Sequence, residues 1–198
     1  MIRAVIFDFY SVIVPDVFEA FEKKVLEEDE DASSKIKKQV DNYYMGLSTF
    51  EYLIGALEYI SGNEEELTKY FRLTDSDIPP IFIEIVKALH LHFMKVGILG
   101  NMGEQEIDLL TKFNEQYQEF DLISGPATYG EPLLSEAFFK AALRDLGEPP
   151  QTCLLISGHQ EYLNFAKQIN MQAYGFVSFD DISSGTLKKL SQTKVNGV

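Results

Sequence analysis

The sequence predicts an α/β protein, in which a parallel sheet is covered by helices on both faces and a helical segment is inserted after the first strand. Three observations lead to this prediction. The short apolar run Ala4–Phe7 is rich in branched residues and too short for a stable helix, which is typical of a buried strand. Helical periodicity without an intervening strand extends from Asp16 to about Thr74. Beyond the polar, proline-marked segment Asp75–Pro80, strands and helices alternate.

The first strand ends directly at a carboxylate, Asp8, and Pro15-Asp16 then supplies a turn signal. Ligands of open parallel sheets sit beyond the carboxyl ends of the strands, where an acid can act as a nucleophile or a metal ligand. An aspartate in this place can equally cap a turn by accepting backbone N–H bonds. This short stretch alone leaves both interpretations open.

The inserted segment has the pattern of a small helical bundle. In the first helix, apolar residues recur at three- and four-residue intervals and form one face. The third helix is predicted to begin at Ser48, with Glu51 completing a capping box, and to end near Ile60. The apolar face comprises Val17, Phe18, Phe21, Val25 and Leu26, and the other two helices are predicted over Ser34–Tyr44 and Glu64–Phe71.

After the insert, the alternating pattern predicts four strands and five helices. The strands are Lys95–Leu99, Leu122–Ser124, Cys153–Ile156 and Gln172–Val177. The helices are Pro80–Leu91, Glu104–Phe113, Leu134–Leu146, Glu161–Ile169 and Ile182–Leu190.

Composition excludes several classes of function. The chain has 198 residues, of which 45% are hydrophobic and 24% charged, as in an ordinary globular protein. Its net charge of −14 would repel nucleic acid and anionic membranes, so we expect neither as a partner. The acidic run Glu27–Asp31 has neither the glycine nor the spacing of a calcium loop, and we interpret it as a solvated helix end or loop.

Cysteine and histidine usage excludes a disulfide framework and argues against a zinc cluster. The single cysteine, Cys153, excludes a disulfide framework, and only three histidines make a zinc cluster improbable on composition. No signal-peptide pattern and no run of 18 apolar residues occurs. We therefore expect a reducing, cytoplasmic location. The sequence does not predict an oligomeric state.

Polar or glycine-containing segments follow three of the predicted strands, at Asp8, Gly100–Asn101 and Ser157–Gly158. With this layout, the chain resembles the haloacid dehalogenase (HAD) superfamily, in the branch with a helical cap after the first strand. The stretches Phe7–Val14 and Met45–Leu53 are most similar to small phosphatases of the glucose-1-phosphatase type. The pattern of Asp8 and Tyr10 also resembles the true haloacid dehalogenases.

The resemblance implies a Rossmann-like, HAD-like core over residues 1–14 and 79–198, with a helical cap over residues 15–78. It also implies that the first-strand aspartate attacks phosphorus and binds Mg²⁺, and Asp8 matches that aspartate. On this basis, the candidate catalytic residues are Asp8 (also the candidate Mg²⁺ ligand), Tyr10 and Asn101, and the candidate substrate-binding residues are Gly100, Asn101, Glu131, Ser157 and His159.

Several of these positions depart from the family pattern. Tyr10 stands where a general acid is usual, and we expect it to pack. Gly100 replaces a Ser or Thr before Asn101, although a tight turn over residues 100–103 fits those residues equally well. Glu131 replaces the Lys that neutralises the transferring phosphoryl group. Ser157 and Gly158 replace the acids that hold the metal, and the following residue, His159, is predicted to be a surface turn histidine.

The charge changes favour a protein with weak or no catalysis. Two like charges about 4 Å apart cost roughly 4 kcal/mol at an effective dielectric of 20, so Glu131 would oppose the chemistry that a Lys assists. A lone carboxylate at Asp8 would hold Mg²⁺ weakly. We therefore predict an inactive or impaired relative, a pseudoenzyme that binds a small phosphorylated metabolite or a protein.

Two alternatives stay open at this point. One is an active HAD-type hydrolase, either a phosphatase or a 2-haloacid dehalogenase, with Asp8 as its nucleophile. The dehalogenase route needs no metal, and Ser157 matches a Ser of that branch. The other is an assembly role for the aromatic side chains of the insert, although aromatics at helical spacing more often face a core.

Overall fold

The computed structural model describes residues 1–26, 30–61, 73–74, 77–117 and 119–182. The helix predicted over Glu64–Phe71 lies outside these residues, as does nearly all of the one predicted over Ile182–Leu190. Among the helices that the structure describes, none combines the length and the apolar character needed to cross a bilayer.

The described strands form one parallel sheet in the order β3-β2-β1-β4-β5, which confirms the predicted fold class. The first strand, β1 (Ala4–Asp8), is central and buried throughout. Residue Phe7 lies opposite Ile98 of β2 and Ile156 of β4, so the three strand ends lie side by side. The other strands are β2 (Lys95–Leu99), β3 (Leu122–Ser124), β4 (Cys153–Ser157) and β5 (Gln172–Gly175).

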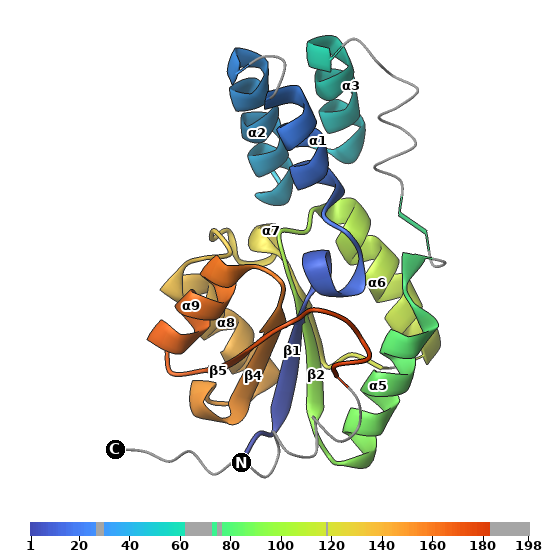
Figure 1. Ribbon diagram of the computed structural model, residues 1–198, viewed down its shortest axis with the longest axis vertical. Coiled ribbons are helices and arrows are strands. Elements are labelled where there is room, and N and C mark those ends of the chain that lie inside the picture. The colour runs from blue at the N-terminus through green and yellow to red at the C-terminus, as the bar shows by residue number, and fades with distance from the viewer. Residues whose placement is uncertain (27–29, 62–72, 75–76, 118, 183–198) are drawn as a thin grey trace.

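Helices cover both faces of the sheet (Figure 1). Because side chains alternate along a strand, Val5 and Phe7 join one apolar cluster with helices α5 and α6, while Ala4 and Ile6 join another with α8 and α9. The helices are α5 (Pro80–Leu91), α6 (Glu104–Tyr117), α8 (Glu136–Leu146) and α9 (Gln160–Gln168).

Three helices stand beyond the carboxyl ends of the strands (Figure 1). We call α1 (Val17–Leu26), α2 (Glu30–Tyr44) and α3 (Phe50–Ser61) the helical unit. The predicted cap of the third helix was wrong by one residue. It is the hydroxyl of Thr49, at 3.3 Å, that accepts from the backbone N–H of Tyr52, and the Ser48 hydroxyl has no partner among the described residues.

A buried carboxylate joins the helical unit to the sheet domain. Glu106 of α6 accepts hydrogen bonds from the hydroxyls of Tyr10 and Tyr43, each at 2.7 Å, and from the backbone N–H of Gly103 at 2.9 Å. The ring of Tyr43, from α2, lies against Gly103 so closely that a Cβ there would be 2.2 Å from it. The helical unit is thus locked onto α6 by hydrogen bonds and by packing.

Three short elements were missed by the sequence patterns. A wide turn, η1 (Phe9–Ile13), follows β1 and is closed by the hydrogen bond from the Val14 N–H to the Phe9 carbonyl, at 3.1 Å. Helix α7 (Pro126–Tyr129) and the 3-10 turn η3 (Pro150–Thr152) are each a single turn long. Elements this short have no periodicity that a pattern could reveal.

Core packing on the α5 face can be tested at Phe82. This side chain is fully buried, with its ring edge-on to Phe7 at 5.0 Å and stacked on Phe120 at 6.0 Å. Phe82→Ala should lower the free energy of unfolding by about 3–5 kcal/mol because it removes these contacts and leaves a cavity. Phe93→Ala, at a 95% exposed residue, is the control and should change it by less than about 0.5 kcal/mol in urea denaturation.

The Glu106 contacts predict a pH dependence of stability. Burial raises the pKa of Glu106, against the opposing effect of the hydrogen bonds from Tyr10 and Tyr43. The native state therefore holds a proton on Glu106 more tightly than the unfolded state does. Stability from this group is lost as pH rises above the ordinary glutamate range, at no more than about 1.4 kcal/mol per pH unit.

The measurement is urea denaturation of the wild type and Glu106→Gln between pH 4.5 and 8. The wild type should lose stability relative to Glu106→Gln as the pH rises. Glu51→Gln, in α3, controls for the loss of an exposed carboxylate. A wild type that gains stability relative to Glu106→Gln over this range would contradict the prediction.

Candidate functional site

The candidate site lies at the carboxyl ends of the adjacent strands β1 and β4, which belong to the two halves of the sheet. In this sheet order, the connections leave β1 and β4 in opposite directions and open a crevice between their carboxyl ends. The parallel pairing of β1 with β4 puts Asp8 beside Ser157. The position that the sequence predicts for the chemistry is therefore also where the topology provides space.

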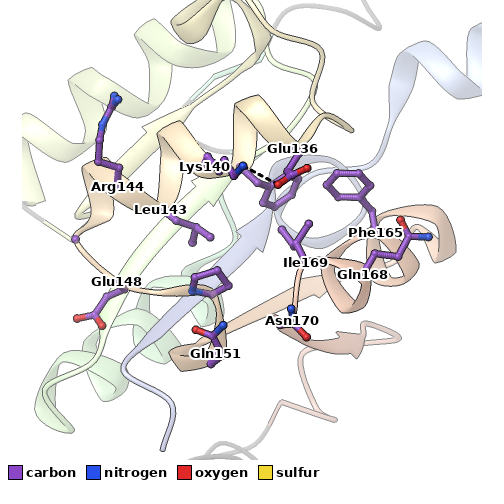
Figure 2. Close-up of a pocket in the computed structure, with 13 residues that line it drawn as sticks. Glu136, Lys140, Leu143, Arg144, Glu148, Gln151, Phe165, Gln168, Ile169 and Asn170 are labelled. Atoms are coloured by element: carbon purple, nitrogen blue, oxygen red, sulfur yellow. Dashed lines mark ion pairs between the residues drawn. The ribbon is translucent and has the colours of Figure 1, made fainter.

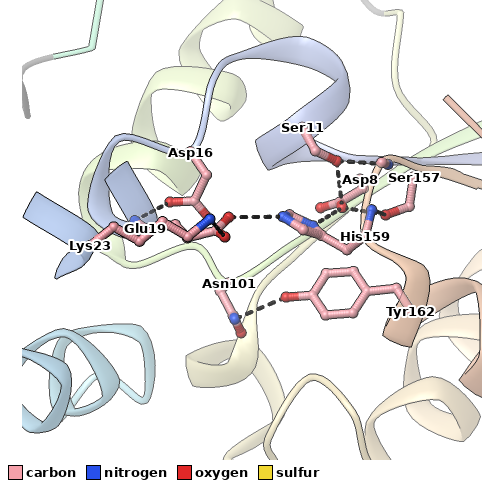
Figure 3. Close-up of polar contacts among 10 residues, drawn as sticks. Asp8, Ser11, Asp16, Glu19, Lys23, Asn101, Ser157, His159 and Tyr162 are labelled. Carbon is pink, nitrogen blue, oxygen red and sulfur yellow. Dashed lines mark hydrogen bonds and ion pairs between the residues drawn. The ribbon is translucent and has the colours of Figure 1, made fainter. Parts of the chain in front are cut away.

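One oxygen of Asp8 is the centre of the polar contacts (Figure 3). Its Oδ2 accepts from the Ser157 hydroxyl at 2.6 Å and from the Ser11 hydroxyl at 3.1 Å, and it lies 2.9 Å from Nδ1 of His159. The other oxygen, Oδ1, is buried and has no partner among the described residues. Asp8 as a whole is only 2% exposed, so its contacts are with the protein rather than with solvent.

The contact between Asp8 and His159 affects the pKa of both side chains. Burial raises the pKa of Asp8, and the hydrogen bonds from His159, Ser157 and Ser11 oppose that rise. The hydrogen bond with Asp8 raises the pKa of His159, against partial desolvation of the ring. The contact therefore favours an ionised Asp8 facing a protonated His159.

His159 does not behave as the predicted surface turn residue. It stands in the turn between β4 and α9, as expected, but its ring points inward to Asp8 and packs against Tyr162 with ring centroids 4.9 Å apart. Ser157 and His159 both contact the same oxygen of Asp8, and the Ser157 hydroxyl accepts from the backbone N–H of His159 at 2.9 Å. The imidazole is thus not placed as a base on Ser157.

The turn η1 places Ser11 over Asp8. Ser11 has a φ of 76°, a left-handed conformation that is uncommon outside glycine, and its hydroxyl also accepts the backbone N–H of Gly158 at 2.8 Å. A Cβ on Gly158 would lie 2.9 Å from the Cβ of Ser11. The Ser11 side chain thus occupies the space that a carboxylate at position 158 would need.

Gly100 is packed in a similar way. A Cβ on Gly100 would lie 3.0 Å from the Cβ of Phe9, so a Ser or Thr there would require Phe9 to move. The neighbouring Asn101 donates from Nδ2 to the Tyr162 hydroxyl at 3.1 Å. Asn101 therefore lies beside Tyr162 in the crevice. Among the described residues, it makes no contact with Asp8.

Two other predicted residues lie apart from Asp8. The hydroxyl of Tyr10 is bound to Glu106 and its ring is buried among aromatic side chains, so it packs as expected. Glu131 lies in the turn after α7, where its backbone N–H donates to the Pro126 carbonyl at 3.2 Å. Within the described part of the chain, Glu131 neither contacts Asp8 nor lines the cavity described next.

A cavity of about 270 Å³ lies between the helical unit and the strand ends. Its charged lining is mostly acidic, which makes it unfavourable for a phosphate. The carboxylates are those of Asp16, Glu19, Asp41 and Glu161, the basic side chains are Lys37 and His159, and the aromatic rings are Phe18, Tyr44 and Tyr162.

The sequence patterns give no sign of Ser11, Glu19, Glu106 or Tyr162 as site residues, and they indicate Asp16 only as part of a turn. Asp16 and Glu19 have the spacing of a helix start, and the backbone N–H of Glu19 does donate to Asp16 Oδ1 at 2.8 Å. That spacing predicts a helix cap and does not predict a binding site. The roles of Ser11 and Glu106 depend on η1 and on packing, for which the sequence has no signal.

The donors around Asp8 do not suit Mg²⁺. This ion requires near-octahedral oxygen coordination and usually one or two carboxylates. At Asp8, one oxygen already takes three contacts from Ser157, Ser11 and His159, and the positions of the family's metal acids are a serine and a glycine. The space for a second acid is filled by Ser11.

A larger cavity, of about 680 Å³, lies between α8 and α9 and the turns that precede β4 and β5 (Figure 2). Its charged side chains pair locally, as Lys140 does with Glu136 at 2.7 Å. It does not reach Asp8, and no Ser, Thr, Cys or His side chain lines it among the described residues. The crevice at Asp8 is therefore the stronger candidate site.

Close packing of Ser11 against Gly158 makes a testable prediction. Gly158→Ala should lower the free energy of unfolding by about 1–3 kcal/mol, because the new Cβ meets Ser11. Ser11→Gly removes that side chain at a φ that glycine adopts freely, so the double variant should be less destabilised than the two single variants added together. Urea denaturation of all four proteins measures the coupling. Strict additivity would show that the two residues do not compete for space.

The chain resembles several solved structures along nearly its whole length. The HAD family enzyme BT-2542 from Bacteroides thetaiotaomicron, in its magnesium complex, superposes with a TM-score of 0.68 at 15% identity, covering 97% of this chain and 99% of that one. A predicted HAD-like family hydrolase from Porphyromonas gingivalis gives 0.66 at 16% identity, covering 98% and 100%.

A third similar structure is L-2-haloacid dehalogenase from Xanthobacter autotrophicus with chloropropionic acid covalently bound. Its TM-score is 0.59 at 20% identity, covering 98% of this chain and 84% of that one. No protein-family model and no curated protein matches the sequence. At these identities the likeness establishes architecture, and this architecture is the HAD-like fold that the sequence predicts.

Proposed function

We propose that this chain is a HAD-fold protein that no longer transfers phosphoryl groups, and that it binds a small cationic ligand in the cavity beside Asp8. One observation carries the proposal: Oδ2 of Asp8 is occupied by three polar contacts while Oδ1 is buried. A nucleophile must reach the atom that it attacks. Here His159, which lines the cavity, stands between it and the carboxylate, and Ser11 takes a further contact on the same oxygen.

The charges of the cavity support loss of hydrolysis. Phosphoryl transfer depends largely on positioning and on cations that stabilise the developing negative charge. Four carboxylates line the cavity, against the side chains of Lys37 and His159. A phosphorylated metabolite, which the resemblance implies, would meet repulsion on the order of 4 kcal/mol for each acid within about 4 Å.

The same lining favours a cation. Carboxylates attract positive charge, and the faces of Tyr44 and Tyr162 can add cation–π stabilisation of about 0.5–2 kcal/mol. We further propose that the helical unit acts as a cap over this cavity, with the chain divided into a cap over residues 15–78 and a core over residues 1–14 and 79–198. Both elements contribute to the lining, α1 and α2 from one side and α9 from the other.

The test is hydrolysis of p-nitrophenyl phosphate with and without Mg²⁺, and halide release from 2-chloropropionate without metal. Working enzymes turn over at about 1–10³ s⁻¹. The wild type should show no turnover above that of Asp8→Asn in either assay. Because Asp8→Asn removes buried hydrogen bonds, its folding is checked by circular dichroism, and a reaction without protein is a second baseline.

Two outcomes would overturn the proposal. Mg²⁺-dependent ester hydrolysis that Asp8→Asn abolishes would establish an active phosphatase. Halide release that Asp8→Asn abolishes would establish a dehalogenase, the alternative that needs no metal.

A further inference from the structure

We propose that Asp16, Glu19 and His159 form a binding site for a divalent transition-metal ion of the Zn²⁺ class, with Asp8 orienting the histidine from behind. This inference rests on the proposed function, because it identifies a metal ion as one cation that binds in the cavity. It concerns a place different from the carboxylate of Asp8, because the three donors lie on the cavity side of the imidazole (Figure 3).

The three side chains come from two segments far apart in the sequence. Asp16 and Glu19 belong to the turn that begins α1, and His159 precedes α9. One donor atom from each lies within 4.8 Å of the donors of the other two. Oε2 of Glu19 is 3.6 Å from Nε2 of His159, and the backbone N–H of Glu19 fixes Asp16 by donating to its Oδ1 at 2.8 Å.

An independent observation comes from the other side of the imidazole ring. Nδ1 of His159 lies 2.9 Å from Oδ2 of the buried Asp8. When the ring is neutral, this contact places its proton on Nδ1 and leaves the lone pair on Nε2, the nitrogen that faces Glu19. Histidines that bind metals almost always donate their second nitrogen to a carboxylate or a carbonyl in this way.

The donor set selects the kind of metal. One imidazole nitrogen with two carboxylates suits zinc and its first-row neighbours, whereas Mg²⁺ and Ca²⁺ prefer oxygen donors alone. Three protein ligands leave a fourth position open, as in zinc sites that bind a substrate or water. All three residues line the cavity, so that position would face space rather than protein.

Competing contacts limit the expected affinity. The other carboxylate oxygen of Glu19, Oε1, pairs with Lys23, and a proton on His159 competes with the metal for Nε2. The contact with Lys23 leaves Oε2 of Glu19 to the metal, whereas a proton on Nε2 of His159 would face that oxygen at 3.6 Å. We therefore expect one site whose affinity falls strongly when any one of the three ligands is removed.

The experiment is a competition titration of Zn²⁺ against a chromophoric chelator at pH 7.5, using full-length protein without a polyhistidine tag. Co²⁺ replaces Zn²⁺ in parallel, because its visible spectrum reports coordination. The wild type should bind one Zn²⁺. Glu19→Gln and His159→Asn should each weaken binding at least about 10-fold. Asp8→Asn, which disturbs the contact that orients His159 together with those from Ser157 and Ser11, should weaken it by about 10–100-fold.

Matched variants act as controls. His92→Ala removes an exposed histidine and Glu51→Gln an exposed carboxylate, and neither residue lines the cavity. Both should bind Zn²⁺ as the wild type does. Glu19 is exposed, so Glu19→Gln tests the site even if His159→Asn or Asp8→Asn proves unstable.

Each outcome decides the proposal. Loss of the Zn²⁺ and Co²⁺ signals in Glu19→Gln, with both controls unchanged, would support it. A wild type that binds neither ion, or zinc binding that Glu19→Gln leaves unchanged, would overturn it. Those failures leave the non-hydrolytic function standing, whereas Asp8-dependent hydrolysis would overturn that function without removing the metal site.

Discussion

The structure of the site depends on the hydrogen bonds that converge on a single oxygen of Asp8. A carboxylate this deeply buried is costly unless donors surround it. Ser157, Ser11 and His159 are those donors, and they come from the end of β4, from η1 and from the turn before α9. The need to satisfy one charge therefore holds η1 against the turn between β4 and α9, two segments that are distant in sequence.

This constraint explains why several positions depart together from the HAD pattern that the sequence resembles. A Cβ at position 158 would lie 2.9 Å from the Cβ of Ser11, and one at position 100 would lie 3.0 Å from the Cβ of Phe9. Both neighbours belong to η1. Once the turn has taken this conformation, the small residues, the inward imidazole of His159 and the buried Asp8 support one another, and none of them could be changed alone without loss.

Much of the fold could be predicted from the sequence because the strands of a parallel sheet are short apolar runs bounded by turn signals. Strands β2 and β3 have the predicted bounds, and helix α5 does as well. The capping error at Ser48 is of a different kind. Adjacent serine and threonine residues have the same capping chemistry, and only the path of the chain decides that Thr49 is used.

The site was less predictable. Asp8, Ser157 and His159 were all singled out as candidates, and the structure brings them together. The inward direction of the His159 ring and the contribution of Ser11 could not be inferred, because both depend on the backbone of η1. Glu106 gave no signal either, since a glutamate near a helix start is ordinarily solvated. Hydrogen bonds from Tyr10, Tyr43 and the Gly103 N–H make its burial tolerable.

The contact between Tyr43 and Glu106 also bears on how the cavity would exchange its contents. To swing the helical unit away from the sheet, the protein would have to break the hydrogen bond from Tyr43 and expose a carboxylate that is almost completely buried. Exchange of a ligand in the proposed cavity would then rely on the exposed side chains that line it, such as Lys37 and Glu161, and exposed side chains change rotamer in picoseconds to nanoseconds. Such a ligand would exchange without the slow rocking of a hinged lid.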